Sequence, residues 1–140
     1  MKTPTLVLAA ALSFAGAARA ADLTVSIEGV RSADGYVMVA LFDGEDAFKE
    51  RKGEVAALRL RAREGQVSAT LHGLPAGTYG FAVYHDENGN SELDANLLGV
   101  PTEGYTFSND ARGNFGPPGF ADAKFGLDTE PLKMTATLSY

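Results

Sequence analysis

Oxygen-bearing side chains occupy alternate positions of one short stretch, HDENGNSELD at residues 85–94. A tight loop that turns alternate residues inward directs their oxygens to a common centre, as in calcium loops of the D-x-[DN]-x-[DN] type. Calcium takes six to eight oxygens and accepts carboxylate, amide and backbone donors together. The spacing therefore predicts a calcium-binding loop over residues 86–96, with the backbone carbonyl of Glu92 among its donors; the predicted ligands are Asp86, Asn88, Asn90, Glu92 and Asp94.

Two positions depart from that loop type. Ser91 stands where a glycine would permit the sharp turn, and Leu97 stands where a bidentate glutamate would complete the shell. An ion would then need one further ligand, for which the candidates are Asn96, Glu103 and Asp110. Asn-Gly is also a strong hairpin signal, and Asp and Asn side chains can bond their own backbone without a metal. On the sequence, a calcium loop and a metal-free turn both remain open.

The distribution of charge favours a cation in this region. The chain has 12 Lys and Arg against 18 Asp and Glu, a formal net charge of −6, and no Lys or Arg lies between Arg63 and Arg112. A basic block from Lys49 to Arg63 precedes that interval, and we expect it to pair with the acidic segment across the fold. An acidic protein lacks the cationic footprint that phosphate binding needs, so nucleic acid is excluded as a partner.

A second candidate site lies in the stretch GYTFSNDARGNFGPPGF, residues 104–120, which is rich in glycine, proline and aromatic rings. Loop aromatics can form a ligand groove for a glycan, a peptide or an envelope partner. The alternative, which the sequence favours, is that the rings pack onto the sheet, because a long loop must bury apolar surface to be ordered. The predicted ligand-binding residues are Tyr105, Phe107, Arg112, Asn114 and Phe115.

Catalytic interpretations have less support. The chain has two histidines and no cysteine, which excludes a disulfide framework, a thiolate zinc site and a cysteine nucleophile. His85 beside Asp86 could act as a general base, but no serine or other nucleophile has a recognisable motif around it. We therefore predict a non-catalytic protein.

The elements that must position these residues have the periodicity of strands. Seven segments, beginning near residues 23, 36, 55, 66, 78, 121 and 131, alternate apolar and polar residues or are short apolar runs. This pattern predicts an antiparallel β-sandwich of about seven strands, with one long ordered loop from Asp86 to about Phe120. The run YVMVALFD, residues 36–43, predicts a central strand buried on both faces, and EDAFKERKGE, residues 45–54, predicts one helical turn or a loop.

Residues 74–125 carry a longer pattern, LPAGTYGFAVYHDENGNSELDANLLGVPTEGYTFSNDARGNFGPPGFADAKF. This block resembles the bacterial secreted family known as domain of unknown function 2141, in which LPxGxY, HDxNxNxxLDxN, EGYxFSN and FGPPxF recur in this order. The flanking strands also fit, so the resemblance covers nearly the whole mature chain. Ser91 departs from it at a place where the family often has glycine. The resemblance implies a small exported β-sandwich of the transthyretin-like or immunoglobulin-like kind, and it implies no established activity.

The first 20 residues have the build of a secretory signal peptide. Lys2 precedes an apolar run over residues 6–18, and Ala18-Arg19-Ala20 forms a small-x-small cleavage site. The apolar run is too short for a spanning helix. We therefore expect cleavage after Ala20, a single domain over residues 21–140 with no transmembrane segment, and a periplasmic or secreted location.

Overall fold

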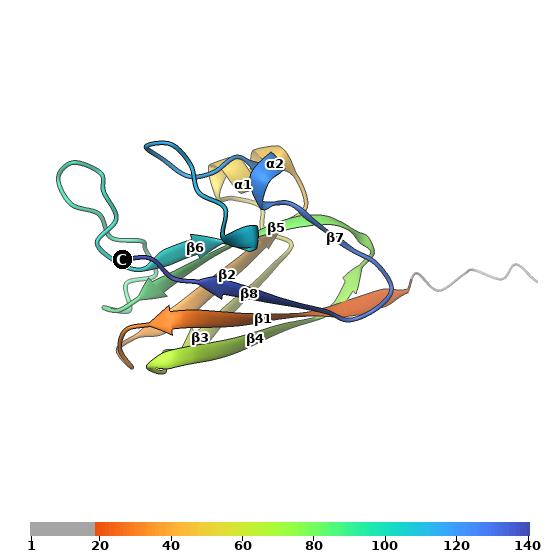
Figure 1. Cartoon of the computed structure of the whole chain (residues 1–140), viewed down its shortest axis with the longest axis horizontal. Helices are drawn as coiled ribbons and strands as arrows, with labels where there is room; N and C mark the ends of the chain where they lie inside the picture. Colours follow the sequence, from red (N-terminus) through yellow and green to blue (C-terminus); the bar gives the residue numbers. More distant parts are fainter. Residues whose placement is uncertain (1–18) are drawn as a thin grey trace, which may run out of the picture.

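The computed structural model describes residues 19–140, so nearly all of the expected signal peptide lies outside the described residues. Two sheets face each other in the described part (Figure 1), and none of its helices is long and apolar enough to cross a membrane. The three-stranded sheet has the order β4-β1-β8 and the larger one the order β3-β2-β5-β6, with β7 also on β5. The strands are β1 Ala20–Val30, β2 Tyr36–Phe42, β3 Ala56–Arg61, β4 Gly65–Pro75, β5 Gly77–Asp86, β6 Tyr105–Phe107, β7 Phe125–Leu127 and β8 Leu132–Thr137.

The predicted all-β sandwich is confirmed, with two differences in detail. The strand β6 lies inside the segment expected to be a loop, where it pairs with β5. The strand β8 runs parallel to β1, whereas the other neighbouring strands are antiparallel. A parallel pair cannot be closed by a hairpin, and this one joins the first and last strands of the described chain.

The core lies between the two sheets and follows the alternation in the sequence. Leu23, Val25 and Ile27 of β1 have no exposed surface, and they face buried residues of the larger sheet such as Val37 and Phe81. The intervening residues of β1 point to the outer face of the smaller sheet and are polar. This outer face has the composition that a sheet facing water requires.

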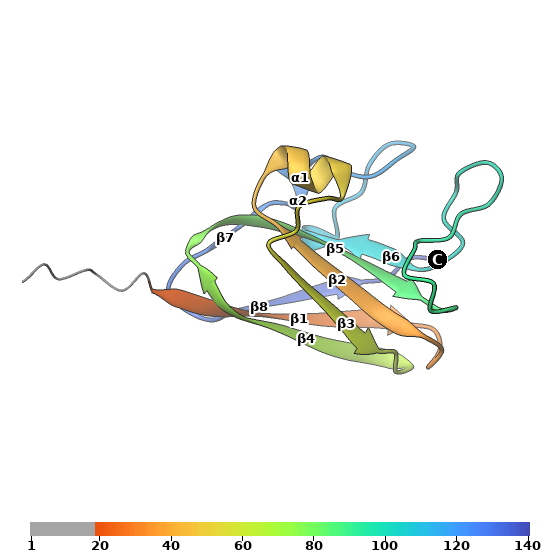
Figure 2. The ribbon, with the colours of Figure 1, turned by 180° about the vertical axis from the view of Figure 1, so that it is seen from behind.

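The strand β2 differs from its prediction of burial on both faces. Its core-facing residues Val37, Val39 and Leu41 are buried, but Met38 and Ala40 on the other face are only half-buried. The helix α1, Glu45–Glu50, covers only one end of that outer face (Figure 2). The apolar run therefore reflects a central strand whose outer side is partly open.

The ring of Phe48 anchors α1 and organises a second, smaller cluster of aromatic side chains. Its centroid lies 5.9 Å from those of Phe42 and Phe107 and 5.5 Å from that of Phe120. Phe120 begins the short helix α2, Phe120–Ala123. Because Phe107 and Phe120 come from the long segment after β5, this cluster attaches that segment to the larger sheet.

A buried serine completes the attachment of the long segment. The strands β6 and β7 pair with the same edge of β5, at Ala82–Tyr84 and Gly77–Tyr79, and leave a gap between them. Ser108, in the 3-10 turn η1 Ser108–Asp110, fills this gap. Its hydroxyl accepts a hydrogen bond from the backbone N–H of Phe81 at 3.0 Å and donates one to the carbonyl of Ala123 at 2.5 Å.

Candidate functional site

The acidic loop starts from a buried carboxylate at the end of β5. Asp86 has no exposed surface, and its carboxylate accepts hydrogen bonds from the backbone N–H groups of Asn90, at 3.1 Å, and Ser91, at 2.9 Å. Ser91 has a φ of 63°, the left-handed conformation that favours glycine. The sixth position of the loop therefore makes the sharp turn of the calcium-loop type, although its residue is a serine.

The other predicted side-chain ligands meet at Asp94. Its two carboxylate oxygens accept hydrogen bonds from the side-chain amides of Asn88, at 2.5 Å, and Asn90, at 2.9 Å. The amide oxygens of Asn88 and Asn90 accept from the backbone N–H groups two positions further on, at 3.1 and 3.0 Å. The structure thus brings Asp86, Asn88, Asn90 and Asp94 together in one turn, with the side chain of Glu92 exposed.

Glu103 joins this turn from the far end of the loop. It is 5 % exposed, and its two carboxylate oxygens accept hydrogen bonds from the backbone N–H groups of Glu87, at 3.0 Å, and Asp94, at 3.1 Å. Of the three candidates for a further ligand, only Glu103 lies at the site. Asn96 caps the loop tip, where it accepts from Leu98 and Val100, and Asp110 accepts from Thr137 of β8.

The carboxylates at the turn create a region of negative potential. Burial of the Tyr84 phenol raises its pKa, and the charges of Asp86 and Glu103 raise it further. No cluster of three or more His, Asp or Glu side chains placed to hold a metal occurs among residues 19–140. A cation at this turn would therefore be held by a mixed set of carboxylate, amide and backbone oxygens, which is the kind of donor set that calcium accepts.

Comparison with known protein families covers most of the chain, including the acidic turn. The model of a bacterial family described as an uncharacterised conserved protein, DUF2141, matches residues 25–135. The chain belongs to the DUF2141 family. Searches of curated proteins and of solved structures find no match. The resemblance stated from the sequence is confirmed at the level of the family, and the finer assignment to a transthyretin-like or immunoglobulin-like fold stays a prediction.

The expected pairing of the basic block with the acidic segment is wrong for this DUF2141 domain. Among residues 19–140 the two ion pairs are Arg31–Glu87, at 2.5 Å, and His72–Asp22, at 2.9 Å. The arginines of the block stack on aromatic rings instead, as with Arg59, whose guanidinium carbon lies 3.5 Å from the centre of the Tyr36 ring. Arg59 lines the same groove as Glu92, but neither ion pair of the described residues joins the block to the acidic turn.

The two histidines of the domain occupy different environments. His85 is fully buried beneath the acidic turn, where Nδ1 lies 2.8 Å from the hydroxyl of Tyr140 and Nε2 lies 2.7 Å from the carbonyl of Asp34. Both ring nitrogens are therefore engaged by the protein itself. His72 lies on the outer face of the smaller sheet and contacts Asp22. The side chain of His85 thereby connects β5 to the turn at Asp34 and to the C-terminal Tyr140.

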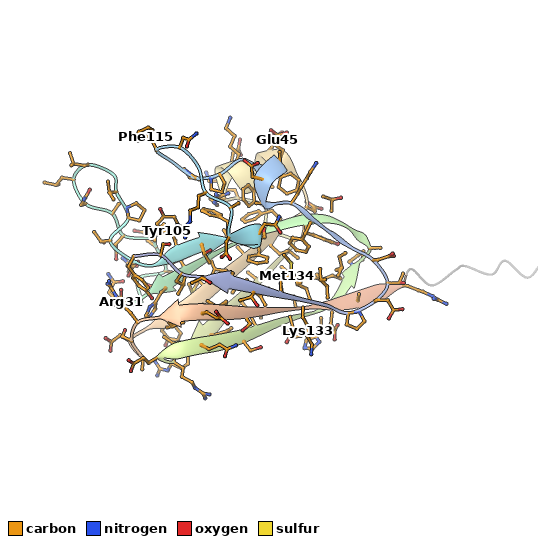
Figure 3. All side chains as sticks on the ribbon, in the orientation of Figure 1. Arg31, Glu45, Tyr105, Phe115, Lys133 and Met134 are labelled. Carbon is orange, nitrogen blue, oxygen red and sulfur yellow. The ribbon has the colours of Figure 1, made fainter. Side chains whose placement is uncertain are left out.

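The five residues predicted to bind a ligand do not form one surface. Tyr105 and Phe107 pack against each other with centroids 6.1 Å apart, and Arg112 joins them around a small cavity of about 130 Å³. Asn114 and Phe115 lie at the exposed tip of the following loop, and Figure 3 shows Phe115 well apart from Tyr105. Tyr105 and Phe107 thus pack on the sheet and also border the larger groove described next, whereas the packing interpretation is wrong for Phe115, whose turn carries it into solvent.

A larger groove lies where the sequence predicted a buried surface. It occupies the outer face of the larger sheet and has a volume of about 600 Å³. Half-buried residues of β2 and β5 contribute to its floor. The apolar run of β2 therefore has one face on the core and the other in this groove. Residues that line it include Met38, Ala40, Arg51, Ala57, Ala82 and Phe107.

Proposed function

We propose that this protein is an exported, non-catalytic β-sandwich whose loop at residues 86–96 binds calcium and thereby stabilises the long segment that follows. One observation carries the proposal. The side chains of Asp86, Asn88, Asn90 and Asp94 converge on one turn that adopts the calcium-loop conformation at Ser91. The turn carries carboxylate, amide and backbone oxygens together, which is the mixed donor set that calcium accepts.

Three carboxylates at or beside this turn have no basic partner. Asp86 and Glu103 accept hydrogen bonds from backbone N–H groups and Asp94 accepts them from two side-chain amides, and within the described part of the chain none of the three forms an ion pair. Negative charges in the same partly buried region repel one another. A divalent cation removes this repulsion. Rotation of the Asn88 and Asn90 amides then turns their oxygens toward the ion.

Support for export comes from the N-terminal sequence and from the type of site. The N-terminal sequence has three features typical of a signal peptide, namely Lys2, the apolar run over residues 6–18 and the motif Ala18-Arg19-Ala20. Calcium sites with incomplete shells bind at about 0.1 to 1 mM, which suits extracellular concentrations of the ion rather than cytosolic ones. Mature protein recovered from the periplasm or medium is expected to begin at Ala21.

Calorimetric calcium titration and thermal unfolding of the metal-stripped protein test the calcium proposal. At ten times the Kd, binding to the folded state adds about 1.4 kcal/mol to the free energy of unfolding and raises Tm by roughly 6 °C. Asp94→Asn retains one acceptor oxygen and removes the charge, so it is expected to abolish this response. Glu92→Gln is the matched control, because its exposed side chain lies outside the turn and its backbone carbonyl is kept.

Each possible outcome of these measurements leads to a different conclusion about the calcium site. A melting curve that does not change at millimolar calcium, together with no heat of binding, refutes the calcium site. An equal response of the wild type and Asp94→Asn refutes the assignment of the ligands. Magnesium at the same concentration is expected to have a smaller effect, because it demands a more regular octahedral shell than this mixed donor set offers.

A further inference from the structure

The two outer faces of the sandwich differ in chemistry. The smaller sheet presents polar side chains to solvent, such as Thr24 and Thr70, whose hydroxyls lie 3.1 Å apart. The larger sheet presents half-buried apolar ones, such as Met38, Ala40 and Ala82. An antiparallel sheet with one face on the core normally has a polar outer face. The apolar outer face of the larger sheet therefore points to an occupant.

Strand register gives this face the form of a trough. Four residues lie opposite one another across β3, β2, β5 and β6, and three of them are alanines. Their methyl groups form a low floor between α1 on one side and the next row of side chains, with Met38 and Tyr84, on the other. Three interstrand spacings give the floor a length of about 14 Å. The floor row is Ala57, Ala40, Ala82 and Phe107.

The wall formed by α1 holds a cation without a counter-ion. Arg51 ends the helix with a φ of 54°, and its guanidinium carbon lies 4.2 Å from the centre of the Phe48 ring and 4.7 Å from that of Phe107. Its Nη1 is buried and has no hydrogen-bond partner. Burial lowers the pKa of the Arg51 guanidinium, and no ion pair within residues 19–140 includes it.

This arrangement leaves hydrogen-bond donors and a positive charge unsatisfied beside an apolar floor. A charge that is partly withdrawn from water, as in the half-buried Arg51, is stabilised by a partner of opposite sign. The planar guanidinium matches the two oxygens of a carboxylate, and the stacked rings hold it in a fixed orientation. The acidic residues that line the groove, Glu54 and Glu92, are exposed at its rim and form no ion pair with Arg51.

We propose that the trough binds a small amphiphile with a single carboxylate, whose head group pairs with Arg51 and whose apolar chain lies along the alanine floor. A volume of about 600 Å³ is within the range of small-molecule sites. The acidic rim residues disfavour a second anionic group on the ligand. Residues 91–93 border the trough as well as the acidic turn, but the proposal does not depend on calcium.

Titration of the purified protein with decanoate, below its micelle concentration, tests this site. Binding is followed by amide chemical shifts and by calorimetry. Saturable shifts are expected at the floor residues Ala40, Ala57 and Ala82. Decanol, which keeps the chain but lacks the charge, and decyltrimethylammonium, which reverses the charge, are each expected to bind at least tenfold more weakly. Equal binding of decanol would overturn the pairing with Arg51.

Variants locate the ligand. Arg51→Met retains the packed stem and loses the charge, so decanoate affinity is expected to fall at least tenfold with decanol unchanged. Ala57→Leu fills one end of the floor and is expected to weaken both ligands; because Ala57 is exposed, this change leaves the fold intact. Arg61→Met is the matched control for Arg51→Met. Arg61 lies on β3, the strand of Ala57, but it does not line the groove. Absence of binding, or shifts confined to other faces, would overturn the proposal.

Discussion

Replacement of Ser108 by alanine tests how the long segment after β5 is attached to the sheet. The hydroxyl of Ser108 bridges the N–H of Phe81 and the carbonyl of Ala123, and the serine has no exposed surface. Ser108→Ala removes one oxygen atom and leaves both backbone groups buried without a partner. Water cannot readily replace the hydroxyl, because the gap between β6 and β7 is closed by the residues around it.

The expected loss follows from the number of groups left unpaired. A buried donor or acceptor that loses its partner costs about 1 to 3 kcal/mol. Because two such groups lose their partners and the surroundings relax somewhat, we expect the free energy of unfolding to decrease by about 2 to 4 kcal/mol. For a domain of this size, the corresponding decrease in Tm is roughly 8 to 16 °C. A domain of ordinary stability survives this loss and remains folded at room temperature.

Urea unfolding followed by far-UV circular dichroism measures the effect. The midpoint is expected to fall and the m-value to stay constant, because the surface exposed on unfolding does not change. Ser68→Ala on the exposed outer face of β4 is the matched control, with an expected change within about 0.5 kcal/mol. A loss below about 1 kcal/mol for Ser108→Ala would show that the aromatic cluster alone attaches the segment.

Two further predictions concern the surroundings of the acidic turn and the opposite sheet. Gly35→Ala is expected to cost at least about 2 kcal/mol in thermal unfolding, because Gly35 has a φ of 65° and an added methyl would overlap the carbonyl of Asp86. In carboxyl NMR titration, the pKa of Asp22 is expected to lie below its ordinary value, because the N–H of Gly73 and then the ring of His72 bond its carboxylate. The corresponding stabilisation is present at neutral pH and is lost as the pH falls through the folded-state pKa of Asp22.

Controls for these two predictions come from the same domain. Gly126→Ala adds a methyl group in a strand with open space around it, and it is expected to leave Tm nearly unchanged. If Gly35→Ala were equally mild, the close approach to Asp86 would be wrong. His72→Ala should move the Asp22 pKa part of the way back and no further, because the bond from Gly73 remains. A full return to the ordinary value would contradict the order of these causes.

Only part of the arrangement of the acidic turn could be predicted from the sequence. The alternation of Asp86, Asn88, Asn90 and Asp94 predicted their convergence, because the spacing is a property of the local backbone. The conformation of Ser91 was not predictable in the same way, since a non-glycine residue adopts a positive φ only where its surroundings require it. Glu103 was one of three candidate ligands, and its approach to the turn depends on how β6 pairs with β5.

By itself, the sequence determined the class of the fold, the faces of its strands and the position of its acidic turn, because these depend on alternation and spacing among near neighbours in the chain. Tertiary structure alone decided that β2 is open on one side, that Ser108 fills the gap beside β5, and that Arg51 lies between two rings beside a row of alanines. These features join residues far apart in the chain. Their physical cause is the pairing register of strands and the packing of rings, which no local pattern encodes.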